Sequence, residues 1–256
     1  MAELKLHQFP CRSDNFGVLI HDPAAGVTAS IDAPETAAVR KALADTGWKL
    51  THIFTTHHHA DHTDGNLELK TLTGCTIVGP RGESGKIPGI DSVMGGGEML
   101  SFGGHQAKVL DTPGHTLGHI SLWFEEAKVA FVGDTLFSLG CGRIIEGDPQ
   151  MMWTSLGRLM ALPPDTSFHC GHEYTEANAR FALGIEPGNT ALQARAAEVK
   201  ALRAAGKPTL PSTIGAELAA NPFLRPHSPE IRQRLGMAGK PDWQVFAEIR
   251  ERKNKA

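Results

Sequence analysis

The sequence has 256 residues, of which 41% are hydrophobic and 21% are charged, and its formal net charge is −3. This is the composition of an ordinary soluble globular protein, and it argues against a disordered chain or a protein that coats nucleic acid. No segment is long and apolar enough to span a bilayer, and the N-terminus lacks the basic and apolar regions of a secretory signal. We therefore expect a cytoplasmic protein without a membrane or nucleic-acid partner, and we expect a monomer by default.

Short apolar segments rich in β-branched residues recur through the first two thirds of the chain, and they are predicted to be strands. In chain order they are residues 16–20, 27–31, 53–55, 76–78, 107–110, 120–124 and 129–132, and a further strand is predicted over residues 166–169. Helices are predicted over residues 35–45 and 66–72, because Gly47 and Gly74 follow them where a helix stop is expected. Strands interleaved with helices predict an α/β layered core.

The pattern changes after Glu173. A helix is predicted to begin near Asn189 or Thr190 and to stop before Gly206, and the remainder is predicted to be helix and loop without clear strands. From Gly188 to the C-terminus there are 12 Lys/Arg against 6 Asp/Glu, so this part is basic and the preceding part is acidic. A basic part of this kind is either a solvated helical face or one wall of a site for an anionic ligand.

Four of the thirteen histidines lie in one octapeptide directly after a predicted strand. It reads Thr55-Thr56-His57-His58-His59-Ala60-Asp61-His62. In extended chain His57 and His59 can point the same way and His58 the other way. Two imidazoles followed by a carboxylate and a further imidazole suit zinc, iron or manganese. The interior position, the interleaved aspartate and the preceding strand favour a metal site over a solvated histidine tract.

Three other predicted strand ends each place an ionisable residue beside a glycine, where sites in α/β proteins usually lie. They are Pro113-Gly114-His115-Thr116, Gly133-Asp134-Thr135 and Gly171-His172-Glu173-Tyr174. Each residue alone is more often a turn or cap residue, but together with the octapeptide they indicate one site. The residues that could orient a metal-bound imidazole, by contact with the part of the ring that does not bind the metal, are Asp32, His58, His119 and His169.

The spacing of His57, His59, Asp61 and His62 resembles the H-x-H-x-D-H signature of the metallo-β-lactamase superfamily. Within it, the chain is similar to the glyoxalase II, or hydroxyacylglutathione hydrolase, family over nearly its whole length. The matching motifs are residues 56–62, 133–137, 140–143, 171–175, 211–215 and 221–225. The resemblance implies an αββα sandwich with a C-terminal helical domain. It implies a metal-binding catalytic domain over residues 1–173 and a helical glutathione-binding domain over residues 174–256.

The resemblance also implies a centre of two divalent metal ions, with zinc favoured and iron or manganese as alternatives. One ion is held by His57, His59 and His115, the other by Asp61, His62 and His172, and Asp134 bridges the two. Asp61 and Asp134 are then catalytic, because they hold the hydroxide that bridges the metals. Metal binding lowers the pKa of water from about 16 to about 7, so no serine or cysteine nucleophile is required.

The implied substrate is a small glutathione thioester, and the implied reaction is hydrolysis of S-(2-hydroxyacyl)glutathione. The usual case in the family is S-D-lactoylglutathione, which gives glutathione and D-lactate in methylglyoxal detoxification. The residues implied to bind the glutathione part are Arg143, Tyr174, Arg250 and Lys253. Glutathione carries two carboxylates, which would give the basic C-terminal part an electrostatic role. The chain departs from the family pattern at Ala60, where a large aromatic is common, and at Asp64, where a second glycine is usual.

The main alternative is an iron-dependent persulfide dioxygenase of the same superfamily, which shares the H-x-H-x-D-H signature but uses one metal. Residues 171–174 and 221–223 favour the hydrolase. A β-lactamase is disfavoured because such enzymes usually have a cysteine at the place of Asp134 and are exported. The net charge of −3 disfavours a nuclease. A protein that only binds metal would turn over no thioester.

Overall fold

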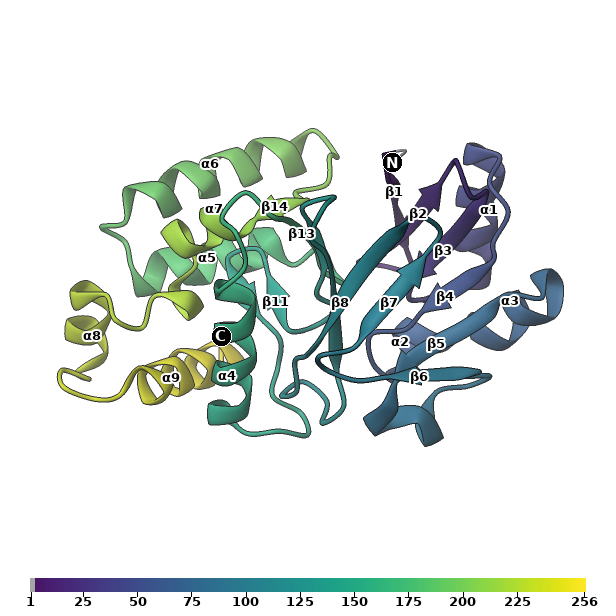
Figure 1. Ribbon diagram of the computed structural model, residues 1–256. Coiled ribbons are helices and arrows are strands. Elements are labelled where there is room, and N and C mark those ends of the chain that lie inside the picture. The colour runs from purple at the N-terminus through teal and green to yellow at the C-terminus, as the bar shows by residue number, and fades with distance from the viewer. Residues whose placement is uncertain (1–2) are drawn as a thin grey trace. The chain divides into compact units, whose positions relative to one another are not determined.

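The computed structural model describes residues 3–256, and the contacts within it divide the chain into two compact units (Figure 1). The first unit contains the chain up to Asp111 together with Thr116–Gly133, and the second contains Thr112–His115 and Asp134–Ala256. Met1 and Ala2, which belong to the segment predicted to lack a secretory signal, lie outside the described residues. Among the described residues, no helix has both the length and the apolar character needed to cross a membrane.

The first unit contains a sheet with the strand order β1-β2-β3-β4-β5-β6. These strands are β1 (Lys5–Cys11), β2 (Asn15–Asp22), β3 (Val27–Ile31), β4 (His52–Phe54), β5 (Thr76–Pro80) and β6 (Ser92–Met94). The pairs from β1 to β3 are antiparallel and those from β3 to β6 are parallel. Parallel neighbours need crossover connections, and the helical segments that supply them are α1 (Thr36–Thr46), α2 (Ala60–Thr63), α3 (Asn66–Thr73) and η1 (Arg81–Lys86). The helices α1 and α3 end at Gly47 and Gly74 in the left-handed conformation, as predicted.

Four antiparallel strands of the same unit pack against one face of this sheet. They are β7 (Met99–Phe102), β8 (His105–Asp111), β9 (Ile120–Phe124) and β10 (Val129–Phe131). The core between the two layers includes Ile20, Phe54, Val109, Leu122 and Phe131, all at most 2% exposed. Figure 1 shows α1 and α3 on the opposite face of the first sheet, where a second core forms. The unit is therefore layered as helix, sheet and sheet.

The second unit is mainly helical. Its helices are α4 (Pro149–Met160), α5 (Thr175–Ile185), α6 (Thr190–Ala204), α7 (Ile214–Ala220), η2 (Pro222–Leu224), α8 (Pro229–Leu235) and α9 (Asp242–Asn254). Two short antiparallel strand pairs accompany them, β11 (Leu136–Phe137) with β12 (Gly140–Cys141) and β13 (Ser167–His169) with β14 (Ser212–Thr213). The prediction of no strand after residue 173 is therefore wrong for β14. This two-residue strand follows Pro211 and carries no apolar pattern, so it depends on its pairing with β13.

Candidate metal centre

The octapeptide after β4 folds into a compact group of donor atoms in the first unit. His59 is extended and occupies the N-cap position of α2, so Asp61 and His62 lie in the first turn of that helix. The candidate ligand nitrogens of His57 and His59 lie within 4.8 Å of one another, and so do those of His57 and His62. The Nε2 atom of His62 lies 3.7 Å from a carboxylate oxygen of Asp61. The four predicted ligands of this unit therefore converge.

Asp32 orients two of these imidazoles, as its place at the end of β3 suggested. Its Oδ2 atom accepts a hydrogen bond from Nδ1 of His62 at 2.7 Å and one from Oγ1 of Thr56 at 2.9 Å. Because the Thr56 hydroxyl donates to Asp32, its oxygen can accept from Nδ1 of His57, which lies at 3.0 Å. Both rings then carry their proton on Nδ1 and a lone pair on Nε2, the form that binds a metal.

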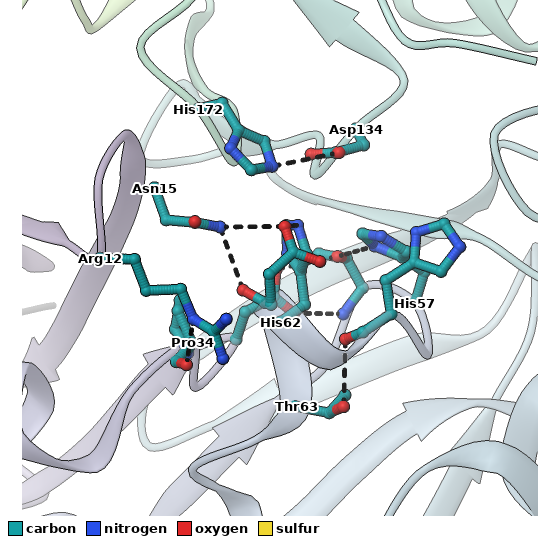
Figure 2. Close-up of polar contacts among 12 residues, drawn as sticks. Arg12, Asn15, Pro34, His57, His62, Thr63, Asp134 and His172 are labelled. Atoms are coloured by element: carbon teal, nitrogen blue, oxygen red, sulfur yellow. Dashed lines mark hydrogen bonds and ion pairs between the residues drawn. The ribbon is translucent and has the colours of Figure 1, made fainter.

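Asn15 fixes the carboxylate of the same motif, and no sequence pattern pointed to it. Its Nδ2 atom donates to the backbone oxygen of Asp61 at 3.0 Å and lies 3.3 Å from the Asp61 carboxylate (Figure 2). Asp64, where the resemblance implies a glycine, forms an ion pair with Arg12. Arg12 in turn donates from Nε to the carbonyl of Pro34 at 2.8 Å (Figure 2). The departure at Asp64 thus ties the end of α2 to the β1–β2 turn.

Glu83 is a second residue that the sequence did not reveal. It is 3% exposed, and its Oε2 atom accepts from both the backbone nitrogen and Nδ1 of His58 at 2.8 Å. Its Oε1 atom accepts from the backbone nitrogen of Gly118 at 2.8 Å. A Cβ at Gly118 would lie 2.5 Å from Cγ of Glu83, so glycine is required for this approach. Glu83 therefore turns His58 away and holds the backbone between His57 and His59.

Glu83→Ala is expected to weaken metal binding by roughly 10- to 100-fold, the effect typical of losing a group that orients a metal ligand. Competition with a chromophoric chelator measures this affinity. Glu98→Ala is the control, because Glu98 is an exposed partner of Arg81 and lies outside the histidine loop. Equal metal affinity in the two variants would contradict the orienting role of Glu83.

In the second unit, Asp134 faces two imidazoles just before β11. Its Oδ2 atom lies 3.4 Å from Nε2 of His115. The same atom lies 3.3 Å from Nε2 of His172 (Figure 2). All three residues are buried, and Nδ1 of His115 donates to the carbonyl of Arg143 at 2.8 Å, which directs its Nε2 atom to the carboxylate. Two donor atoms, each about 2.1 Å from a tetrahedral zinc ion, lie about 3.4 Å apart. These spacings therefore fit shared ligation of a metal.

The aromatic residue predicted to bind substrate is in contact with one of these imidazoles. The rings of Tyr174 and His172 are stacked with centroids 4.7 Å apart and an angle of 3° between their planes. Phe137 packs edge-on against Tyr174 at 5.3 Å. Tyr174 is 37% exposed, so one part of the ring can meet a ligand while the other packs on the candidate metal ligand.

The predicted basic residues occupy different environments in the second unit. The Arg143 side chain is exposed, whereas Arg250 is 6% exposed and donates from Nη1 to the carbonyl of Cys141 at 2.9 Å. Lys253, one turn later in α9, donates to the carbonyl of Ala177 at 3.2 Å. Burial, followed by the charges of Arg250 and Arg180, lowers the pKa of Lys253. An anionic ligand would relieve this repulsion between cations.

The two other histidines that were predicted to orient ligands, His119 and His169, are both buried. His119 stacks on His57 in the first unit, with ring centroids 5.0 Å apart. His169, in β13 of the second unit, is buried, and burial lowers its pKa to about 4. The His169 imidazole is therefore neutral near pH 7. The seven predicted ligands fall into a group of four in the first unit and a group of three in the second.

Comparison with known proteins identifies the class and then the family. Residues 17–172 match the model of the metallo-β-lactamase superfamily, and residues 173–256 match the hydroxyacylglutathione hydrolase C-terminus. The crystal structure of ETHE1 from Myxococcus xanthus is similar, with a TM-score of 0.67 and 26% identity over 97% of this chain and 98% of that one. The chain therefore has a metallo-β-lactamase fold with a C-terminal helical region, as predicted.

Curated relatives define the family more closely. The hydroxyacylglutathione hydrolase of Brucella anthropi is 57% identical over 251 residues, which cover 98% of this chain and 96% of the relative. That of Brucella ovis is also 57% identical, over 98% of both chains. The chain belongs to the hydroxyacylglutathione hydrolase family. This confirms the predicted family and favours a hydrolase over the dioxygenase alternative.

Proposed function

We propose that the protein hydrolyses S-(2-hydroxyacyl)glutathione thioesters, with S-D-lactoylglutathione as the typical substrate and glutathione and D-lactate as products. The observation that carries this proposal is the presence in one compact unit of Asp134 with its two imidazoles and of the basic residues of α9. Full-length similarity to hydrolases of this name supports the same reaction. We further propose a cytoplasmic monomer, with residues 1–173 as the catalytic domain and 174–256 as the glutathione-binding domain.

The described residues fit two divalent metal ions, and zinc is proposed as the ion. The proposed ligands are His57, His59 and His115 for one ion, Asp61, His62 and His172 for the other, and Asp134 for both. The donors are imidazoles and carboxylates, which zinc, iron and manganese all accept. When bound, the ions supply a water of low pKa and polarise the thioester carbonyl.

The protein's own residues prepare the centre for this chemistry. Asp32 and Thr56 hold the lone pairs of His62 and His57 on Nε2, and the Arg143 carbonyl does the same for His115. The carboxylates of Asp61 and Asp134 contribute negative charge that offsets the charge of two cations. These groups are fixed before substrate arrives, so little reorganisation is required during the reaction.

The proposed substrate contacts explain why a thioester suits this site. Arg143, Arg250 and Lys253 offer cationic donors to the two carboxylates of glutathione, and Tyr174 offers a hydroxyl and a ring face. The leaving group is a thiolate whose parent thiol has a pKa of about 8.5, so it departs without a strong general acid. Cleavage of an amide would demand proton delivery to the leaving nitrogen.

The test is the release of free thiol from S-D-lactoylglutathione by purified, metal-loaded protein. We expect rapid release that a strong chelator abolishes and that added metal restores. Oxygen consumption with glutathione persulfide is measured in parallel. Absence of thiol release from protein that holds two metal ions would overturn the proposed reaction.

A further inference from the structure

The β11–β12 hairpin connects two residues of the proposed site. Asp134 lies two residues before β11, and Arg143 lies two residues after β12. The backbone nitrogen of Gly142 donates to the carbonyl of Thr135 at 3.1 Å, and a Cβ at Gly142 would lie 1.8 Å from the Asp134 carbonyl. The two ends of the hairpin are therefore in close contact, and a shift of the hairpin must move both.

The turn of this hairpin has a conformation that its own residues do not favour. Leu139 has a φ of 56°, in the left-handed region that disfavours leucine. A Cβ at Gly140 would lie 2.4 Å from Nδ2 of Asn178, and that Nδ2 atom donates to the carbonyl of Ser138 at 3.2 Å. The turn is therefore held by contacts with other elements of the second unit.

A buried carboxylate in α7 supplies several of these contacts. Glu217 is 1% exposed, and its Oε1 atom accepts from the hydroxyls of Ser138 at 2.9 Å and Ser212 at 2.7 Å. Its Oε2 atom accepts from the backbone nitrogen of Leu139 at 2.7 Å and from Nδ2 of Asn221 at 3.0 Å. Burial raises the pKa of this carboxyl, and its hydrogen bonds act in the opposite direction.

Asn221 connects the same carboxylate to both strands of the hairpin. Its Nδ2 atom lies 3.2 Å from the carbonyl of Phe137 in β11 and 3.0 Å from the carbonyl of Gly140 in β12. Its Oδ1 atom accepts from the backbone nitrogen of Phe223 at 3.0 Å. The Asn221 amide nitrogen therefore lies within hydrogen-bond distance of three oxygen atoms, those of Phe137, Gly140 and Glu217. Its amide oxygen links this group to η2 through Phe223.

We propose that Glu217 and Asn221 are positioning residues that hold the β11–β12 hairpin and thereby set the places of Asp134 and Arg143. The role of those two residues rests on the proposed function. In this arrangement the C-terminal helical region contributes to metal binding as well as to substrate binding, although neither Glu217 nor Asn221 is a ligand.

Asn221→Asp is the sharpest test, because the new side chain has the same shape but places a carboxylate against three oxygen atoms. We expect metal affinity to fall by roughly 10- to 100-fold, as for other groups that orient ligands, and kcat to fall with it. Glu217→Ala removes the acceptor of the Ser138 hydroxyl and of the Leu139 backbone nitrogen, so it is expected to lower metal affinity in the same direction.

Asn189→Asp is the matched control. Asn189 also donates to a buried carboxylate, Glu186, at 2.9 Å, but it caps α6 and does not contact the hairpin. We expect this variant to retain metal affinity and the KM for the thioester, whatever its melting temperature. Wild-type metal affinity in Asn221→Asp, or an equal loss in Asn189→Asp, would overturn the positioning role.

If Asn221→Asp does not fold, two less disruptive variants test the same proposal. Ser138→Ala and Ser212→Ala each remove one hydroxyl donor from the same oxygen of Glu217, but only Ser138 lies in the hairpin turn. A larger loss of metal affinity in Ser138→Ala supports the proposal, and equal losses overturn it. Metal affinity is measured without substrate, so a failure of the proposed reaction would show separately as metal-loaded wild type that releases no thiol.

Discussion

Replacing Asp134 with asparagine is expected to reduce kcat for a glutathione thioester by at least about a thousandfold, because metal-assisted charge stabilisation contributes several kcal/mol and each tenfold corresponds to about 1.4 kcal/mol. The variant keeps the shape of the side chain but removes the charge that faces Nε2 of His115 and Nε2 of His172. Metal content after gel filtration should fall as well. The measurements are thiol release and metal stoichiometry on the same preparation.

Asp148→Asn is the control for this experiment. Asp148 is an exposed carboxylate of the same unit that caps α4 by accepting from the backbone nitrogen of Met151. Asparagine caps helices as well as aspartate does, so the variant loses one charge at little cost in stability. We expect wild-type turnover from it. Substantial turnover by Asp134→Asn with full metal content would refute the proposed bridging role of Asp134.

The sequence predicted the elements whose patterns are local. All of the predicted strands occur within a few residues of their predicted limits, because most of them are short apolar runs that are largely buried in the structure. The strand β1 was missed, since Pro10 interrupts its pattern and a proline argues against a strand. It is tolerated because β1 lies at the edge of its sheet. Strands such as β11, β12 and β14 are two residues long and have no period to detect.

The sequence also predicted only those residues of the candidate site that lie in local patterns. The proposed ligands lie in motifs in which ionisable residues are closely spaced, so residue types and spacing were sufficient to propose them. The role of Asp32 as a partner of a candidate ligand could be predicted because Asp32 ends a predicted strand. Its hydrogen bond with His62 confirms that prediction. Glu83 and Asn15 lie outside any motif. Glu83 is 25 residues from its partner His58, and Asn15 is 46 residues from its partner Asp61. Glu217 is 78 residues from Leu139. Such partners are fixed by tertiary packing, which one sequence does not display.

The second large effect is expected at the cationic residues of α9. The double variant Arg250→Met with Lys253→Met should raise the KM for a glutathione thioester by roughly 10- to 100-fold, because a hydrogen bond to a charged group contributes about 1.5 to 3 kcal/mol. Initial rates over a range of thioester concentrations measure this. Arg252→Met is the control, since Arg252 lies on the same helix and pairs with Glu248. An unchanged KM in the double variant would refute the assigned substrate contacts.

Single substitutions at Arg250 and Lys253 distinguish the effect of charge on substrate binding from the effect of holding the backbone at Cys141. Arg250 donates to the carbonyl of Cys141, so Arg250→Lys keeps the charge but loses the planar donor that holds this backbone. We expect Arg250→Lys to lower kcat as well as raise KM, because Cys141 precedes the segment that carries Arg143. Lys253→Met should change mainly KM, since the contacts of Lys253 with the Ala177 carbonyl and the Phe181 ring lie in α5 and not in the hairpin. If attraction of the glutathione carboxylates dominates, the KM of the wild type will also rise with ionic strength, and this salt dependence will be weaker in the double variant.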